Sequence, residues 1–180
     1  RAVHCDDAKS FFAARGRADD LIVSEPSNPW VSGVAGLFSV EFYRHVARYL
    51  ADGGLFAQWL QIYETHPERV ISVLKAVDQS FADWLVVAVD QSDLLIVAAP
   101  RGRVVLRADA FGRLSHETRA RLRRLAVATP ADTIHRVIGD RRMFKPWLDR
   151  QNVAANSDFA PYLDAHADRD RFVGSSFGDL

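Results

Sequence analysis

Apolar and polar positions follow two different patterns along the first hundred residues. Three short apolar runs predict strands, at residues 2–5, 20–25 and 55–62. Three stretches with apolar residues at helical spacing predict helices, at residues 7–14, 39–50 and 67–81. The segment 84–99 has two apolar runs joined by a polar turn and predicts a hairpin. This order indicates an α/β doubly wound sheet that ends in an antiparallel edge.

The flanking residues support these elements. Ser39 can cap the second helix, Asp52-Gly53-Gly54 is expected to end it, and Pro67 can begin the third. The strand at 20–25 is almost continuously apolar, which is typical of a strand in a sheet covered on both faces.

The second half of the chain has a different pattern. It predicts only short helices, over 117–127, 131–138 and 142–148, and an irregular tail from residue 151. The stretch "RARLRRL" is basic, but leucines interrupt it at helical spacing. A solvated helix face is therefore favoured over a binding patch.

Composition limits the classes of function. The chain has 180 residues, enough for one domain with a core, and a formal net charge of zero, which argues against a nucleic-acid partner. Cys5 is the single cysteine, so neither an internal disulfide nor a cysteine zinc site can form, and the six histidines lack metal-ligand spacing. No apolar run reaches the roughly 18 residues of a membrane helix. Because it begins with Arg1 in an apolar stretch, we expect a piece of a longer protein or one whose start was removed.

Polar side chains follow the ends of all three predicted strands. Ligands in open α/β sheets bind beyond the carboxyl ends of the strands, so these residues could share one site. Each also has a plainer interpretation: Asp7 as a helix cap, Trp30 as a core residue, and Gln58 as a partner of nearby backbone. The candidates are Asp6 and Asp7, residues 25–30, and Gln58, Gln61 and Tyr63.

The segment 25–30, "EPSNPW", is stiff. Pro26 and Pro29 fix their own φ angles and push Glu25 and Asn28 toward extended geometry. A carboxylate that can accept a proton, beside an amide that can orient N–H groups, suits the binding of an amine. The alternative is a proline-stiffened crossover loop without chemistry.

These stretches resemble one family. "CDDAKSFF" and "DLIVSEPSNPWVSGVAGLFSVEFYRHVARYLADGGLFAQWLQIYE" are similar to the spermidine synthase (polyamine aminopropyltransferase) family, closest to a bacterial branch often fused to membrane-transporter-like segments. The resemblance covers about residues 1–100 and returns at "NSDFAPYLD", residues 156–164, which is similar to an Asn-Thr-Asp…Pro motif of that branch.

The resemblance implies a class I methyltransferase-like (Rossmann-like) fold and decarboxylated S-adenosylmethionine as co-substrate, without a metal. By resemblance, Asp7 and Ala8 would contact the adenine, and Glu25 would stand in place of the catalytic aspartate that positions and deprotonates the acceptor amine. Asn28 would replace a second aspartate that binds the diamine. The remaining residues expected on the substrate side are Trp30, Gln58 and Tyr63.

The chain departs from the family in three ways. The family has aspartate where Glu25 and Asn28 stand, and it carries a tyrosine and proline pattern near the hairpin that residues 84–100 lack. Its glycine-rich nucleotide loop and ribose-binding acidic residue lie upstream of this region. With the usual strand order 3-2-1-4-5-7-6, residues 2–5 would be strand 3 and 20–25 strand 4, so the first half of the fold is expected to be missing.

We therefore expect residues 1–100 to be the C-terminal portion of a spermidine synthase-like nucleoside-binding domain. Residues 101–180 would form a helical extension and an irregular tail that pack on it. Two other functions stay open: an S-adenosylmethionine-dependent methyltransferase acting on an amine, and a non-catalytic nucleoside-binding domain of a membrane protein. The expected partners are a polyamine or other amine and the upstream part of the same protein, with a homodimer as an option. The resemblance implies a cytoplasmic domain, alone or in a membrane-anchored bacterial protein.

Overall fold

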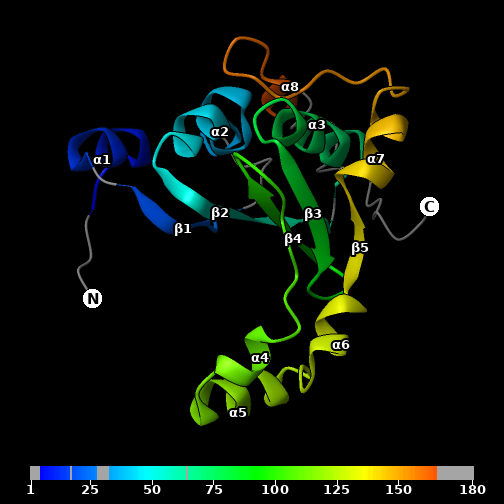
Figure 1. Cartoon of the computed structure of the whole chain (residues 1–180). Helices are drawn as coiled ribbons and strands as arrows, with labels where there is room; N and C mark the ends of the chain where they lie inside the picture. The colour runs from blue at the N-terminus through cyan, green and yellow to red at the C-terminus, as the bar shows by residue number, and fades with distance from the viewer. Residues whose placement is uncertain (1–4, 17, 28–32, 64, 166–180) are drawn as a thin grey trace.

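The chain folds around one mixed sheet of five strands (Figure 1). The structure, a computed structural model, describes residues 5–16, 18–27, 33–63 and 65–165. The spatial order is β1-β2-β4-β3-β5. The strands are β1 (Asp19–Ser24), β2 (Leu50–Gln61), β3 (Asp83–Ala88), β4 (Asp93–Ala99) and β5 (Val137–Asp140).

Strand directions confirm the predicted fold class. β1 and β2 are parallel, whereas β2 with β4, β4 with β3, and β3 with β5 are antiparallel. The hairpin predicted over 84–99 is the β3–β4 pair. The order β1-β2-β4-β3 corresponds to positions 4-5-7-6 of a methyltransferase-like sheet, so the fold is a partial Rossmann-like methyltransferase fold. The strand predicted at 2–5 lies almost wholly outside the described residues, and Cys5 is not in a strand.

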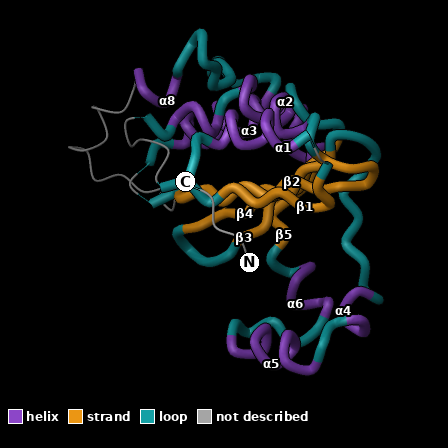
Figure 2. The backbone as a smooth tube through the Cα atoms, turned by 90° about the vertical axis from the view of Figure 1, so that its left-hand side faces the viewer, coloured by secondary structure: helices purple, strands orange, loops and turns teal. Residues whose placement is uncertain are grey.

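Five helices form a layer on one face of the sheet (Figures 1 and 2). These are α1 (Ala8–Arg15), α2 (Val40–Ala47), α3 (Pro67–Asp78), α7 (Arg141–Leu148) and α8 (Tyr162–Ala165). A short 3-10 helix, η1 (Ala35–Phe38), leads into α2.

The helix starts agree with the sequence signals. The Ser39 hydroxyl accepts a hydrogen bond from the Phe42 N–H at 3.2 Å, and Pro67 occupies the first turn of α3. The buried face of α2 meets the sheet through aromatic rings, whereas the buried face of α3 is aliphatic. The Phe56 and Phe81 rings stack at a centroid distance of 5.5 Å, and Tyr43 contacts both rings. Burial of these aromatic and aliphatic side chains in one cluster stabilises the layer.

The expected end of the second helix was wrong. Asp52-Gly53-Gly54 does not end a helix: α2 ends at Ala47, and these residues lie within an irregular start of β2. A Cβ on Gly54 would stand 3.0 Å from the Asp19 carbonyl oxygen, so a glycine is needed where β1 passes β2 closely.

The second half of the chain is not helical throughout. The helix predicted over 131–138 ends at Ile134, and Val137–Asp140 form β5 on the edge of the sheet beside β3. The helix α7 then turns back onto the sheet, where the Phe144 ring stacks on Trp84 at 5.8 Å. Gly139 leaves room for this return, because a Cβ there would stand 2.8 Å from the Phe144 ring.

Residues 100–136, between β4 and β5, form a separate projection that we name the arginine-rich lobe (Figure 1). It contains three short helices and lies on the opposite side of the sheet from α1, α2 and α3 (Figure 2). The helices are α4 (Ala110–Arg113), α5 (His116–Arg124) and α6 (Pro130–Ile134).

The C-terminal segment 151–165 crosses the helical layer and is held by polar contacts. The buried Asn156 side chain donates to the Ala35 carbonyl at 2.9 Å and accepts from the Leu163 N–H at 3.2 Å. The Ser72 hydroxyl donates to the Ala154 carbonyl at 2.7 Å. The "NSDFAPYLD" stretch is therefore anchored to the helical layer through the buried Asn156 and Leu163, while the segment from residue 151 is irregular, as expected, up to α8. The proposed division of the chain at residue 100 stays a prediction.

None of the helices within the described ranges has both the length and the apolar character needed to span a bilayer.

Candidate functional site

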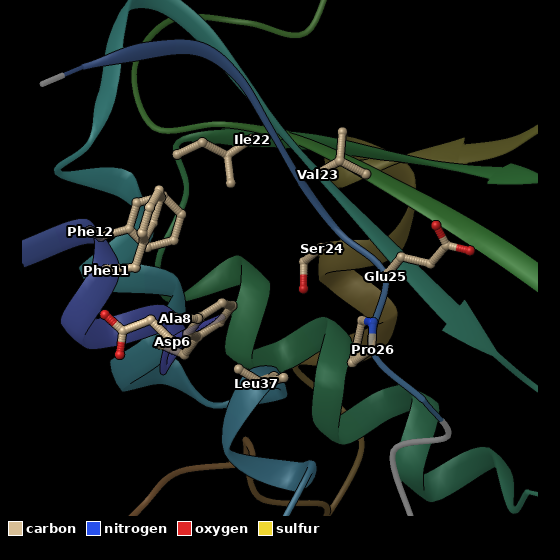
Figure 3. Close-up of a pocket in the computed structure, with 11 residues that line it drawn as sticks. Asp6, Ala8, Phe11, Phe12, Ile22, Val23, Ser24, Glu25, Pro26 and Leu37 are labelled. Atoms are coloured by element: carbon tan, nitrogen blue, oxygen red, sulfur yellow. The ribbon is translucent and has the colours of Figure 1, made fainter. Parts of the chain in front are cut away.

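A cavity of about 430 Å³ lies between α1 and the carboxyl end of β1 (Figure 3). This is the edge of the sheet at which open α/β folds bind ligands, and the volume falls within the roughly 300–1,000 Å³ of small-molecule sites. Among the described residues its lining comprises Asp6, Ala8, Phe11, Phe12, Ile22, Val23, Ser24, Glu25, Pro26, Leu37 and Phe42.

The start of α1 forms one end of the cavity. Asp7 caps this helix, with its Oδ1 accepting a hydrogen bond from the Ser10 N–H at 3.0 Å. Asp6 Oδ1 accepts from the Asp7 N–H at 2.8 Å, and the Asp6 side chain lines the cavity together with Ala8. The carboxylate that lines this end of the cavity is therefore that of Asp6. Asp7 caps the helix, which was the alternative interpretation of this residue in the sequence.

The middle of the cavity is apolar. Phe11 and Phe12 come from α1, Ile22 from β1 and Leu37 from η1. Phe12 is fixed from behind by Tyr49, whose ring stacks on it at a centroid distance of 5.5 Å. A flat apolar group such as a nucleobase matches walls of this kind.

Glu25 lies at the other end, directly after β1. Figure 3 shows its carboxylate directed away from Asp6 and Ala8, on the side to which Val23 also points, whereas Ser24 points in another direction. Alternation along an extended backbone explains this arrangement, because residues 23 and 25 share one face of the strand. The side chain is exposed, so an acceptor could reach it from solvent.

Gln58 supports the end of β1 from the neighbouring strand. It is fully buried and opposite Ser24 in the parallel register. Its Nε2 donates to the Ser24 carbonyl at 3.3 Å and to the Trp59 carbonyl at 2.9 Å. Gln58 thus satisfies the Ser24 carbonyl, immediately before Glu25. Its Oε1 is buried without a hydrogen-bond partner among the described residues.

The structure brings together only some of the predicted residues. Ala8 and Glu25 line the same cavity, with Asp7 and Gln58 directly beside it. Tyr63 follows the end of β2, is 38% exposed and is not part of that lining. Asn28 and Trp30 lie outside the described residues.

Sequence reasoning missed the cavity roles of Ser24 and Leu37, and it named Asp6 as a candidate without a separate role. Asp6 could have been chosen over Asp7 only by knowing which of two adjacent carboxylates caps the helix. Leu37 lies in a short 3-10 helix without periodicity, and no sequence signal marks it.

The fold and the position of the cavity define a class, the methyltransferase-like Rossmann folds. A solved structure of a probable spermidine synthase from Corynebacterium glutamicum ATCC 13032 superposes with a TM-score of 0.55 at 18% sequence identity, covering 86% of this chain and 53% of that one. This chain thus spans about half the length of that protein. MnmC2 from Aquifex aeolicus matches with a TM-score of 0.40 at 14% identity, covering 91% of this chain and 41% of the other, and no conclusion rests on it. No family model and no curated protein matches the sequence.

Proposed function

We propose that this chain forms part of a spermidine synthase-like transferase site, which moves an aminopropyl group from decarboxylated S-adenosylmethionine to an amine of a polyamine. The observation that carries the proposal is the single cavity shared by the start of α1 and the end of β1, with Ala8 at one end and Glu25 at the other. The similarity in fold to a probable spermidine synthase supports the same class of chemistry without identifying the substrate.

The two ends of the cavity suit the two substrates. The apolar walls and the Asp6 carboxylate fit a nucleoside, whose base would lie between the phenylalanines and Leu37. Glu25 fits the acceptor, because a primary amine is protonated at neutral pH and must lose a proton before it can attack. In the reaction, the amine nitrogen forms a bond to the propyl carbon, the carbon–sulfur bond breaks with its electrons remaining on sulfur, and Glu25 takes the amine proton directly or through water.

A second candidate is methyl transfer to an amine. The sequence has Asn28 where the aminopropyltransferase family has a second aspartate, and the loss of that charge weakens the attraction for a dicationic diamine. A neutral amide after the catalytic position fits an acceptor with one amine. Incubation of the complete protein with S-adenosylmethionine and, separately, with its decarboxylated form distinguishes the two reactions.

The test of the proposal is the Glu25→Gln substitution in the complete protein. Glutamine keeps the shape and hydrogen-bonding reach of the side chain but cannot take a proton, so kcat/KM should fall by about 10²–10⁴. Glu25→Asp, the matched control, restores the residue of the family with a shorter reach and should keep part or all of the activity. Steady-state kinetics provide the measurement.

Nucleoside binding, measured by calorimetry with methylthioadenosine, should be nearly unchanged in Glu25→Gln, because Asp6 lies at the other end of the cavity and the phenylalanines line its middle. Near-normal turnover of Glu25→Gln would contradict the catalytic role of Glu25. Nucleoside binding without turnover of either co-substrate would favour a non-catalytic binding domain.

A further inference from the structure

Part of the wall of the candidate cavity is a single helical turn, the 3-10 helix η1. Its Leu37 side chain lines the cavity, where Figure 3 shows it between Ala8 and Pro26. A 3-10 helix of four residues has poor hydrogen-bond geometry, and one turn is not stable without tertiary support. The position of Leu37 in the cavity wall therefore depends on the contacts that hold η1.

The other side of η1 faces a second hollow, of about 330 Å³, which Ala35 and Gly36 line together with Asn156 and Pro161. Packing supports the two ends of η1 unequally. Phe38 is fully buried and fixes one end through its ring, whereas Ala35, at the other end, is buried but offers only a methyl group for contact. Hydrogen bonds therefore have the larger part in fixing the Ala35 end.

Asn156 supplies these hydrogen bonds from the C-terminal segment. Its Nδ2 donates to the Ala35 carbonyl at 2.9 Å, at the start of η1. Its own main-chain carbonyl accepts from the Val40 N–H at 3.0 Å, two residues after the end of η1. Asn156 is 1% exposed, so water does not readily replace the amide, and loss of the amide would leave a buried carbonyl unsatisfied.

Asn156 is fixed in turn by two helices. Its Oδ1 accepts from the Leu163 N–H of α8 at 3.2 Å, and its N–H donates to the Ser72 carbonyl of α3 at 3.3 Å. Each polar atom of Asn156 thus has a partner within the fold. Among the described residues Asn156 is not part of the cavity lining, so it connects α3 and α8 to η1 without facing the ligand.

We propose that Asn156 is a positioning residue for the candidate cavity and acts through Leu37. It holds η1 at both ends, so that Leu37 stays in the apolar wall on which the base of a nucleoside packs. This role rests on the proposed function, which takes the ligand of the cavity to be a nucleoside. A residue that only anchored the C-terminal segment would change stability and leave the affinity for the nucleoside as it is.

The test is the binding of methylthioadenosine to the complete protein, measured by calorimetry. Asn156→Asp keeps the shape of the side chain and the acceptor for the Leu163 N–H but removes the donor to the Ala35 carbonyl. The dissociation constant should therefore rise about three- to tenfold. Asn156→Ser removes the amide without adding a charge; it should have the same effect and takes the place of the first variant if that one does not fold.

Ser72→Ala is the matched control. The Ser72 hydroxyl holds the same segment through the Ala154 carbonyl at 2.7 Å, but it ties the segment to α3 and not to η1. This substitution should lower the free energy of unfolding, measured in urea, and change the dissociation constant of methylthioadenosine by less than about twofold. In steady-state kinetics, Asn156→Asp should raise the KM of the nucleoside co-substrate and leave kcat close to that of wild type, because Glu25 lies at the other end of the cavity.

A double-mutant cycle tests whether Asn156 acts through Leu37. Leu37→Ala alone should raise the dissociation constant of methylthioadenosine, because it removes part of the wall. In the Leu37→Ala background, Asn156→Asp should add less than about twofold, since the side chain that Asn156 positions is already gone.

Three results would each overturn the role of Asn156: unchanged nucleoside affinity in a folded Asn156 variant, an equal effect of Ser72→Ala, or full additivity with Leu37→Ala. A wild type that binds methylthioadenosine but turns over neither co-substrate would contradict the proposed reaction and not the role of Asn156. A wild type that binds no methylthioadenosine would overturn both.

Discussion

At the scale of single residues, Glu41 shows how a carboxylate that looks like an ordinary helix residue can hold distant segments together. It lies in the first turn of α2, and its two oxygens accept hydrogen bonds from the Ser157 hydroxyl at 2.9 Å and the Asp158 N–H at 2.8 Å. Partial burial acts to raise the pKa of Glu41, but the hydrogen bonds from Asp158, from its own backbone and from Ser157 outweigh it, so that pKa lies below its ordinary value.

This direction predicts a loss of stability in acid. A carboxylate whose pKa is lower in the folded state contributes stability above its unfolded pKa, about 4.3 for glutamate, and loses it as pH falls through the folded value. We expect Glu41→Gln to lower the free energy of unfolding at pH 7 and to reduce the difference in stability between pH 7 and pH 3. Urea unfolding at both pH values gives the measurement. Glu68→Gln, an exposed first-turn carboxylate of α3, is the control. An unchanged pH dependence in Glu41→Gln would show that this contact adds nothing to stability.

The candidate site was only partly predictable at this scale. Glu25 and Asp6 could be placed in one site because carboxyl ends of strands meet at one edge of a sheet, and Ala8 was expected there by resemblance. The direction of the Glu25 side chain could not be predicted. It depends on the residue at which β1 ends, because side chains alternate between the two faces along a strand. The buried position of Gln58 depends on its register with Ser24, which involves residues 34 positions apart.

At the scale of elements, the end of α5 carries a residue in an unfavourable conformation. Ala126 has a φ of 56°, in the left-handed region that favours glycine. Its N–H donates to the Arg123 carbonyl at 3.1 Å, and the Val127 N–H donates to the Leu122 carbonyl at 3.0 Å, which is the Schellman pattern of a helix end. Glycine is the usual residue at this position.

Ala126→Gly should therefore stabilise α5, by roughly 0.5–1 kcal/mol. The same substitution in the middle of this helix, Ala120→Gly, should destabilise it by about 1 kcal/mol, because glycine has low helix propensity. Native-state hydrogen exchange of the α5 amides measures both effects. If both substitutions changed the stability of α5 in the same direction, the prediction would be contradicted.

Most elements were predictable because their signals are local. Ser39 and Pro67 mark the starts of α2 and α3, and the hairpin has apolar runs on both sides of a polar turn. The strand β5 has only four residues, and its hydrogen bonds are made with β3, about fifty positions earlier in the chain. The irregular start of β2 depends on the close approach of the Asp19 carbonyl to Gly54. The sequence pattern of β2 alone gives no sign of this approach.

At the scale of the whole molecule, stability is expected to be uneven. The sheet and its helical layer share one buried cluster, whereas the arginine-rich lobe has none. Amides of α4, α5 and α6 should therefore exchange through local opening, with protection lower than that of α3, whose inner face is buried. Hydrogen exchange of the backbone amides measures this difference. Equal protection in α5 and α3 would mean that the lobe unfolds only together with the sheet.

The Asn156–Ala35 hydrogen bond joins positions 121 residues apart, and this separation has a consequence for synthesis. A growing chain acquires about 5–20 residues per second, so roughly 6–24 s pass between the addition of Ala35 and that of Asn156. The segment that leads from the candidate site into α2 therefore emerges long before its anchor exists. This side of the cavity is therefore completed only after Asn156 has been added, and termination before Asn156 would leave the Ala35 carbonyl without the amide that it accepts from.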